Sequence, residues 1–161
     1  MKVLLALLIA AALGYFLGSL NFSIIVVKLM KGRDTAELSV LNHISDISVK
    51  RCDKDYGFFR NMTDNDKAEI TACHNEMLKN AFKGDYDMII LDEFNSAYHY
   101  GLLDKEFAKH LILNGREYCE TVLTGRNPDE VFLKSADYVS EICCVRHPYK
   151  KGISARKGIE Y

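Results

Sequence analysis

Hydrophobic and polar positions divide the chain into one long apolar segment and a region in which short apolar runs alternate with helical patterns. The apolar segment extends from Val3 to Val27 and contains no charged side chain. Further along, short runs rich in apolar and β-branched residues, bounded by polar or turn-forming residues, predict strands. The predicted strands are residues 24–29, 47–52, 88–91, 121–123 and 138–145.

The clearest helical pattern lies between the second and third predicted strands. It begins near Thr63, a residue type favoured as an N-cap, with Asp66 three residues later. Apolar side chains then recur at helical spacing until Gly84, a residue that commonly ends helices. This spacing predicts one helix whose apolar stripe packs into the core.

Two shorter helices are predicted at residues 104–113 and 128–135. The second has Asn127 as its expected cap and Pro128 at its first position, where a missing backbone N–H costs nothing. Strands that alternate with helices in this way indicate a layered α/β domain built on a mainly parallel sheet. The sequence shows no internal repeat and no proline-rich linker.

The apolar segment has the length of a membrane-spanning helix. At about 1.5 Å per residue, a helix over residues 3–27 would cross a hydrocarbon core of about 30 Å with some tilt. Lys28, Lys31 and Arg33 follow the segment, whereas Lys2 alone precedes it. The positive-inside rule then predicts that the rest of the chain lies in the cytoplasm.

This pattern predicts two units: residues 1–27 as an apolar leader of the transmembrane type, and residues 28–161 as one soluble domain. The leader is the only part for which membrane contact is expected. A secretory signal peptide, with small residues at positions 10–12, is one alternative. A buried strand and a fusion or misjoined segment are the others.

Composition limits the partners of the second unit. When Lys2 is set aside, the 21 Lys and Arg become 20, against 22 Asp and Glu. This balance provides no broad basic surface, so nucleic acid is not expected as a partner. The five cysteines form an odd set without C-x-x-C spacing. They are predicted to be reduced thiols of a cytosolic protein, with neither a zinc site nor a disulfide framework.

Polar residues follow two of the predicted strands. Asp92 and Glu93 come directly after the apolar run MIIL, and the carboxyl ends of parallel strands are where ligands bind. An acidic pair there can hold Mg²⁺, directly or through water, beside a polyphosphate. In VLTGRNPDE, Gly125 and Arg126 precede a helix, a position that suits a guanidinium meeting phosphate oxygens. The alternatives are a plain strand end and a tight turn with a solvated arginine.

Two further groups have open interpretations. The ending RHPYKKGISARKGIEY is basic and either covers an anionic ligand or forms a solvated tail. Its basic residues are Arg146, His147, Lys150, Lys151, Arg156 and Lys157. Tyr98 and Tyr100 follow the acidic pair and either flank a planar ligand or pack against the sheet.

Six motifs occur in one order along the chain: KGRDTAEL, DYGFF, LDEFNSAYHYGLLD, LTGRNPDE, RHPY and ARKGIEY. Together they resemble the corrinoid adenosyltransferases of the cobalamin pathway, the CobA, CobO or BtuR family, over about residues 27–161. The resemblance implies a RecA-like layered fold related to P-loop NTPases. It also implies transfer of the 5′-deoxyadenosyl group from ATP to cob(I)alamin or cob(I)yrinic acid a,c-diamide, with Mg²⁺. A cytoplasmic homodimer and a partner that reduces the cobalt are further expectations.

Individual residues follow from the motifs they occupy. Glu93 matches the family's magnesium-side acid, with Asp92 beside it, and Arg126 matches the arginine of the T-G-R loop. Asn127 continues that loop and is expected to contact the bound nucleotide. His147 and Lys157 lie in the last two motifs and are expected to contact a bound ligand.

The DYGFF motif carries the expected corrinoid contact. Phe58 matches the aromatic that packs against the corrinoid and helps to remove its lower ligand. Many members have tryptophan two residues beyond it, where this chain has Arg60, and Phe59 is the candidate second aromatic. Without the resemblance, Phe58 and Phe59 would be interpreted as a hydrophobic anchor in a loop.

One expected unit is not visible. No glycine begins a G-x-x-x-x-G-K-[ST] match, so the sequence predicts a truncated fold without the first strand, phosphate loop and first helix. The stretch GYFLGSLNFSIIVVKLMKG resembles the first membrane helix of bacterial acyl-phosphate glycerol-3-phosphate acyltransferases, a resemblance that covers roughly residues 1–31. Two alternatives to an active adenosyltransferase follow: a membrane-tethered protein that binds corrinoid or nucleotide without catalysis, and a fragment of such an acyltransferase.

Overall fold

The computed structural model describes residues 24–28, 41, 43–54, 56, 59–115 and 118–154. Within them, parallel strands form one sheet in the order β2-β1-β3-β4. The strands are β1 (Ile24–Lys28), β2 (Ile47–Arg51), β3 (Met88–Asp92) and β4 (Glu120–Leu123). The α/β class and the parallel sheet predicted from the sequence are therefore confirmed.

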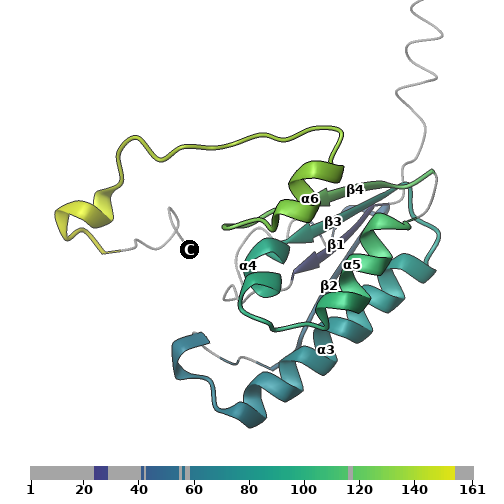
Figure 1. The fold of residues 1–161 in the computed structure, drawn as a ribbon, viewed down its shortest axis with the longest axis horizontal. Coiled ribbons are helices and arrows are strands. Elements are labelled where there is room, and N and C mark those ends of the chain that lie inside the picture. Colours follow the sequence, from purple (N-terminus) through teal and green to yellow (C-terminus); the bar gives the residue numbers. More distant parts are fainter. Residues whose placement is uncertain are drawn as a thin grey trace, which may run out of the picture.

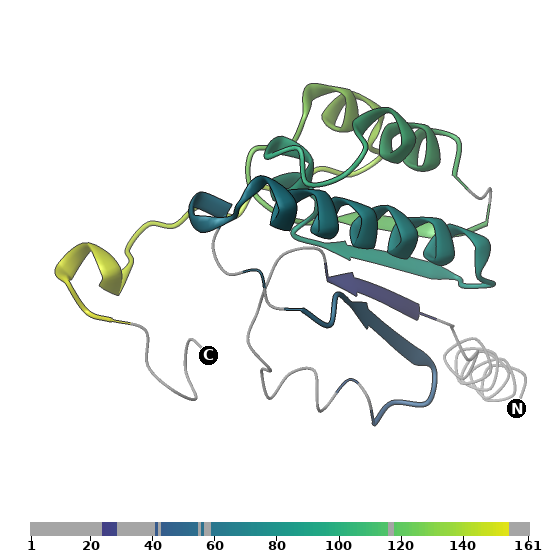
Figure 2. The same ribbon diagram turned by 90° about the horizontal axis from the view of Figure 1, so that it is seen from below.

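Helices follow the strands and cover the sheet (Figures 1 and 2). They are α3 (Asp64–Lys83), α4 (Phe94–His99), α5 (Lys105–Leu113) and α6 (Glu130–Ser135), with short 3-10 helices η1 (Phe59–Asn61) and η2 (Pro148–Lys151). The long helix α3 packs beside α5 and next to β1, near the middle of the sheet.

The hydrophobic core joins α3 and β3 to α4, α5 and α6, each of which contributes buried apolar side chains. Along α3 the buried residues Ile70, His74, Leu78 and Ala81 recur at three- and four-residue intervals, as an amphipathic helix requires. In β3 the side chains of Ile89 and Leu91 are buried, and the alternate positions are only half-buried. The apolar stripe predicted for this helix, Ile70, Cys73, Met77 and Ala81, is confirmed in part: its first and last residues are buried, whereas Cys73 and Met77 are half-buried.

Of the two helix caps predicted from the sequence, one is confirmed and one is wrong. Thr63 caps α3: its hydroxyl accepts the Asp66 N–H at 3.2 Å, and its own N–H donates to Asp66 Oδ2 at 3.1 Å. Asp104 likewise caps α5. The cap predicted for α6 is wrong, because the helix begins at Glu130 after Asp129. Asn127 has a φ of 53°, whereas an N-cap residue is normally extended.

The predicted strand at residues 138–145 is also wrong. These residues run as an exposed segment without strand pairing, and in both views the chain leaves the layered body after α6 (Figures 1 and 2). The side chains of Ile142 and Val145 are 97% and 95% exposed. Alternating apolar residues form a strand only where a neighbouring strand accepts their hydrogen bonds, and among the described residues none lies there.

The apolar leader is corrected at its end. Residues 24–27 were included both in a membrane-type helix and in the strand predicted at residues 24–29. The strand prediction is confirmed, because these residues form most of β1, which pairs with both β2 and β3 and spans the domain boundary predicted at residue 27. The sequence Ile-Ile-Val-Val is β-branched throughout and suits a strand. The rest of the leader, residues 1–23, lies outside the described residues. In the part that the structure describes, no helix is long and apolar enough to cross a membrane.

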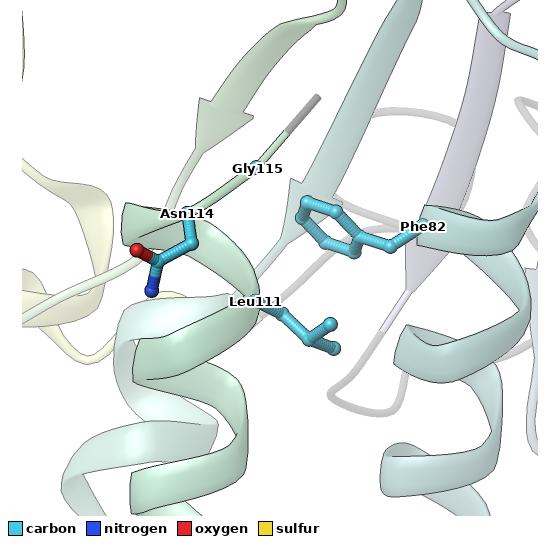
Figure 3. A pocket seen from close by; sticks show the side chains of 4 residues that line it. All are labelled: Phe82, Leu111, Asn114 and Gly115. Carbon is cyan, nitrogen blue, oxygen red and sulfur yellow. The ribbon is translucent and has the colours of Figure 1, made fainter. Parts of the chain in front are cut away.

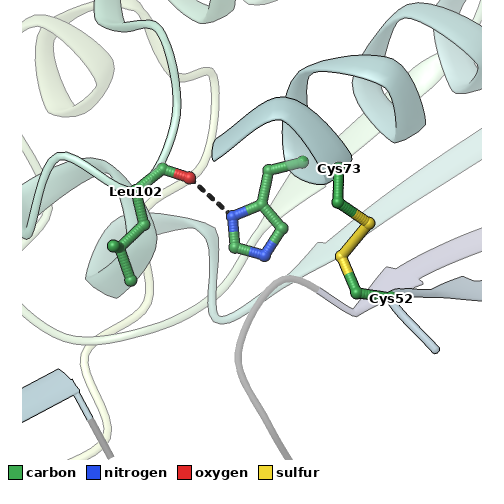
Figure 4. The surroundings of a disulfide bond; sticks show 4 residues. Cys52, Cys73 and Leu102 are labelled. Carbon is green, nitrogen blue, oxygen red and sulfur yellow. Dashed lines mark hydrogen bonds between the residues drawn. A yellow bond between two sulfur atoms is a disulfide. The ribbon is translucent and has the colours of Figure 1, made fainter. Parts of the chain in front are cut away.

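The cysteines are not all reduced. Cys52, just after β2, forms a disulfide with Cys73 in the middle of α3, with their Cα atoms 6.2 Å apart (Figure 4). Beside it, the buried His74 Nδ1 lies 2.6 Å from the Leu102 carbonyl oxygen, to which it donates as the N–H tautomer. The prediction of a chain without disulfides is wrong because the fold, rather than sequence spacing, brings the two cysteines together.

Candidate functional site

The candidate site lies where β3 and β4 end side by side. Asp92 is the last residue of β3, and Thr124 directly follows β4. The Thr124 N–H donates to the Leu91 carbonyl oxygen at 3.1 Å, and the Asn95 N–H donates to the Thr124 carbonyl oxygen at 3.0 Å. The strand order reverses between β1 and β3, where Asp92 pairs in register with Lys28. Such a reversal opens the ligand-binding crevice of a parallel sheet.

Two hydroxyl groups hold the acidic pair. The Thr124 hydroxyl donates to Asp92 Oδ1 at 2.9 Å and accepts the Glu93 N–H at 2.9 Å. The Ser96 hydroxyl donates to Glu93 Oε2 at 2.7 Å and accepts the Arg126 N–H at 3.3 Å. Ser96 is only 6% exposed, while both acids are half-buried. The carboxylates and the arginine turn therefore belong to one hydrogen-bonded cluster.

The backbone at this cluster has left-handed positions on both sides. Glu93 has φ 58° and ψ 22°, the left-handed helical region that residues other than glycine rarely adopt. Gly125 has φ 120°, and a Cβ atom placed there would lie 3.2 Å from the Asn95 and Ser96 backbone nitrogens. Glycine in the T-G-R stretch is thus required by both its dihedral angle and the close approach of α4.

Arg126 and Asn127 form the exposed turn that follows Gly125. The backbone N–H of Arg126 donates to the Ser96 hydroxyl, and the residue is exposed. Asn127 completes the turn in a left-handed conformation. Asp92, Glu93 and Arg126 lie at the ends of two strands that the sequence predicts, and the structure places these strands side by side. Their chemical roles remain predictions.

His147 is not brought to this cluster. It caps η2, where its Nδ1 accepts the Tyr149 N–H at 3.1 Å, and η2 lies away from the layered body in both views (Figures 1 and 2). Phe58 and Lys157 lie outside the described residues. The expectation that these three residues contact a ligand is therefore untested by the arrangement of the described residues.

An aromatic pair connects the DYGFF region with the residues after α4. The Phe59 ring stacks on the Tyr100 ring, with centroids 4.6 Å apart and an interplanar angle of 24°. Tyr100 is 45% exposed, whereas Tyr98 is buried against Phe94 and Phe132. Of the two interpretations of these tyrosines, Tyr98 packs in the core, where burial raises the pKa of its phenol. Tyr100 instead stacks on Phe59 and is partly open to solvent.

Two residues of the site were not identified from the sequence. Ser96 and Thr124 both lie inside quoted motifs, but serine and threonine are common in such stretches. Their positions relative to Glu93 and Asp92 depend on how α4 and the loop after β4 lie against the end of β3. No spacing rule indicates these contacts, since the residues of the Thr124–Asp92 bond lie 32 positions apart.

A small pocket of about 170 Å³ lies elsewhere (Figure 3). It is lined by Phe82 at the end of α3 and by Leu111, Asn114 and Gly115 at the end of α5. Because these helices lead into β3 and β4, their ends lie at the amino-terminal side of the sheet, opposite the acidic pair. Its lining has no charged side chain, and the pocket is not part of the candidate site.

Comparison with known proteins gives one family. The profile described as ATP:corrinoid adenosyltransferase BtuR/CobO/CobP matches residues 10–161. A corrinoid adenosyltransferase of Sinorhizobium sp is 37% identical over 75 residues, which cover 46% of this chain and 35% of that protein. The corrinoid adenosyltransferase of Escherichia coli K12 is 34% identical over 104 residues, covering 62% of this chain and 52% of that protein. The chain thus spans about half or less of the length of these relatives.

The family match begins inside the predicted leader. It starts at residue 10, so it includes the whole stretch GYFLGSLNFSIIVVKLMKG that resembles an acyltransferase membrane helix. None of the matches reported above is to an acyltransferase, and that resemblance finds no support. The matched range also extends the family likeness upstream of residue 27, where the motifs alone placed its start.

Proposed function

The chain belongs to the ATP:corrinoid adenosyltransferase family, and from this premise we propose that it transfers the 5′-deoxyadenosyl group of ATP to a corrinoid, cob(I)alamin or cob(I)yrinic acid a,c-diamide. One observation carries the proposal. Two carboxylates and an arginine turn are held together by hydrogen bonds at the carboxyl ends of β3 and β4. This is where a parallel sheet with reversed strand order binds its ligand.

The reaction needs little acid–base chemistry from the protein. The electron pair of cobalt(I) attacks the ribose C5′, a cobalt–carbon bond forms, and the C5′–O bond breaks with its electron pair leaving on triphosphate. The nucleophile is thus part of the corrinoid substrate. The tasks of the chain are to hold ATP, to orient the corrinoid and to exclude water from the cobalt.

The acidic pair fits Mg²⁺. This ion is usually held by one or two carboxylates together with waters and substrate phosphates, rather than by an all-protein cage. Asp92 and Glu93 provide two adjacent carboxylates, and no cluster of three or more metal-binding side chains occurs among the described residues. When bound, Mg²⁺ would supply positive charge beside the triphosphate. Glu93 and Asp92 are the residues that would hold it.

The arginine turn fits the phosphate groups. Arg126 is exposed next to the acidic loop, and a guanidinium forms bidentate hydrogen bonds with phosphate oxygens. Asn127 lies at the tip of the same turn and is proposed to contact the nucleotide. His147 and Lys157, from the basic C-terminal segment, are proposed to cover the bound ligand.

The corrinoid is proposed to bind at the aromatic residues after β2. Phe58 is assigned to the corrinoid on the family motif, and the stacked rings of Phe59 and Tyr100 support an apolar surface in the same region. An apolar face disfavours water as a cobalt ligand and so favours the reduced metal. A homodimer in the cytoplasm and an electron-transfer partner that reduces the cobalt complete the proposal.

The test is product formation by the purified chain. The chain is incubated without oxygen with ATP, Mg²⁺ and cob(I)alamin made with a chemical reductant, and adenosylcobalamin is measured by chromatography. The proposal expects product from the native chain. Glu93→Gln is expected to form product at least a hundredfold more slowly, because it would weaken the hold on the Mg²⁺ that stabilises the negative charge developing on the triphosphate. Absence of product with the native chain would contradict the activity.

A second candidate is corrinoid or nucleotide binding without catalysis. The observation that favours it is the lack of a G-x-x-x-x-G-K-[ST] match in the 161 residues, since such a loop supplies backbone N–H groups, a lysine and a hydroxyl to the phosphates. Saturable binding of cob(II)alamin or of ATP, without adenosylcobalamin formation, would favour this candidate over the enzyme.

A further inference from the structure

We propose that the hydroxyl groups of Ser96 and Thr124, defined here as the hydroxyl brace, are positioning groups that hold the acidic pair for a divalent cation. The inference rests on the proposed function, because it concerns the same site. It assigns a role to two further residues. Neither hydroxyl would bind the metal itself; each would orient a carboxylate that does.

Each hydroxyl makes the same pair of bonds. A hydroxyl has one proton to donate and lone pairs that accept. Thr124 donates to the Asp92 carboxylate and accepts the Glu93 N–H, both at 2.9 Å. Ser96 donates to the Glu93 carboxylate at 2.7 Å and accepts the Arg126 N–H at 3.3 Å. Each proton is thus committed to a carboxylate, and each oxygen is fixed by a backbone donor.

The two bonds at each hydroxyl connect different segments. Thr124 follows β4 and fixes the end of β3, while Ser96 lies in α4 and fixes the turn after β4. Glu93 is constrained at three points: its left-handed backbone, its N–H and one carboxylate oxygen. A non-glycine residue held in this conformation by several bonds is typical of a functional site.

Fixing a carboxylate before a cation arrives raises affinity for that cation. A hydroxyl bond to one oxygen sets the carboxylate's rotation, so less freedom is lost when the cation binds. Removal of hydrogen-bond partners of metal ligands typically lowers metal affinity or activity by about 10–100-fold. The brace also fixes the backbone of Arg126 relative to Glu93. The residue proposed to contact phosphate is thereby held in one position relative to the residue proposed to hold the cation.

The test uses Mn²⁺ as the probe, with the full chain, in the presence and absence of ATP. Binding is followed by electron paramagnetic resonance of free Mn²⁺. Ser96→Ala and Thr124→Val are each expected to raise the Mn²⁺ Kd by about 10–100-fold. Thr124→Ser keeps the hydroxyl and is expected to stay within about threefold of the native Kd. Ser135→Ala is the matched control, because its hydroxyl bonds the Val131 and Phe132 carbonyl oxygens within α6.

Melting temperature separates positioning from a structural role. If the brace only supports folding, Thr124→Val lowers the melting temperature while the Mn²⁺ Kd of the folded fraction equals that of Thr124→Ser, and the inference is overturned. If Ser96→Ala does not fold, the Thr124→Val and Thr124→Ser pair decides the result.

The two levels of the proposal fail differently. A native chain that binds Mn²⁺ but forms no adenosylcobalamin contradicts the proposed activity. The effect of the brace on the Mn²⁺ Kd can still be measured in that case. Native and brace variants with equal Mn²⁺ affinity contradict the brace alone. A native chain that binds no Mn²⁺, with or without ATP, contradicts both the brace and the acidic pair as a cation site.

Discussion

Cys52 and Cys73 join the end of β2 to the middle of α3 through a disulfide, and the segment enclosed by this bond contains the DYGFF motif. A second attachment supports the same arrangement: Lys54 Nζ pairs with Glu69 of α3 at 2.6 Å and with Asp66 at 3.5 Å. The disulfide therefore fixes one end of the segment that is proposed to contact the corrinoid.

Reduction of this disulfide is expected to destabilise the protein by about 3 kcal/mol, because a loop of this size gains conformational freedom in the unfolded chain. The melting temperature should fall by roughly 10 °C in the presence of a thiol reductant. The Cys52→Ser/Cys73→Ser double variant serves as control and should melt at one temperature with or without reductant. Alkylation of all five cysteines in the unfolded, non-reduced chain would contradict the bond.

Gly125→Ala is expected to lower the free energy of unfolding by about 3 kcal/mol, because φ is 120° and the added Cβ would meet the backbone of α4 at 3.2 Å. Gly101→Ala is the matched control: φ is 68° there and nothing lies within 4 Å, so only the left-handed cost of about 1 kcal/mol applies. Urea unfolding measures both values. Equal losses for the two variants would show that the contact with α4 is not tight.

Thr63→Ala is expected to raise the pKa of Asp66. The Thr63 side-chain and backbone hydrogen bonds, with smaller contributions from Lys54, hold that pKa below its ordinary value. A lowered carboxylate pKa contributes stability above the unfolded pKa, and this stability is lost as pH falls through the folded pKa. The stability gap between Thr63→Ser and Thr63→Ala should therefore narrow in acid.

NMR titration of the Asp66 carboxyl carbon measures this prediction directly. Thr63→Ser keeps the hydroxyl and should leave the Asp66 pKa close to the native value. Loss of the cap in Thr63→Ala should also cost about 1 kcal/mol of unfolding free energy near neutral pH. An Asp66 pKa that does not differ between the two variants would contradict the capping box as the cause.

Tyr100→Ala is expected to weaken corrinoid binding about tenfold, which corresponds to about 1.4 kcal/mol and is the size of a lost aromatic pair. Tyr100→Phe keeps the ring that stacks on Phe59 and should bind corrinoid like the native chain. Fluorescence quenching by cob(II)alamin gives both dissociation constants. Equal weakening in the two variants would indicate that the phenol hydroxyl, rather than the stacked ring, is the important group.

Part of the fold was predictable because its signals are local. The Thr63 and Asp66 pair marks the start of α3, and Asp104 marks the start of α5, since a cap and its partner lie within one helical turn. Short apolar runs identified β1 to β4. The start of α6 was mispredicted because two residues that can cap a helix, Asn127 and Asp129, precede it. The left-handed backbone of Asn127 places that residue in the turn, and Asp129 caps the helix.

The candidate site was predictable only in outline. The position of Asp92 and Glu93 follows from the apolar run before them, and parallel strands bring their ends to one edge. The Ser96 and Thr124 contacts depend on how α4 packs against the loop after β4. The pattern of hydrophobic and polar residues does not predict this packing. The Cys52–Cys73 bond and the exposed course of residues 138–145 are likewise results of which elements lie beside one another.

The sequence by itself determined the α/β class, the parallel strands, the starts of two helices, the acidic pair after β3 and the family likeness, because each of these is written in neighbouring residues. Only the tertiary structure decided that β1 lies between β2 and β3, that two distant cysteines join, and that two hydroxyls hold the carboxylates. The physical reason is that hydrogen bonds and packing between elements depend on distance in space, which the order of residues does not contain.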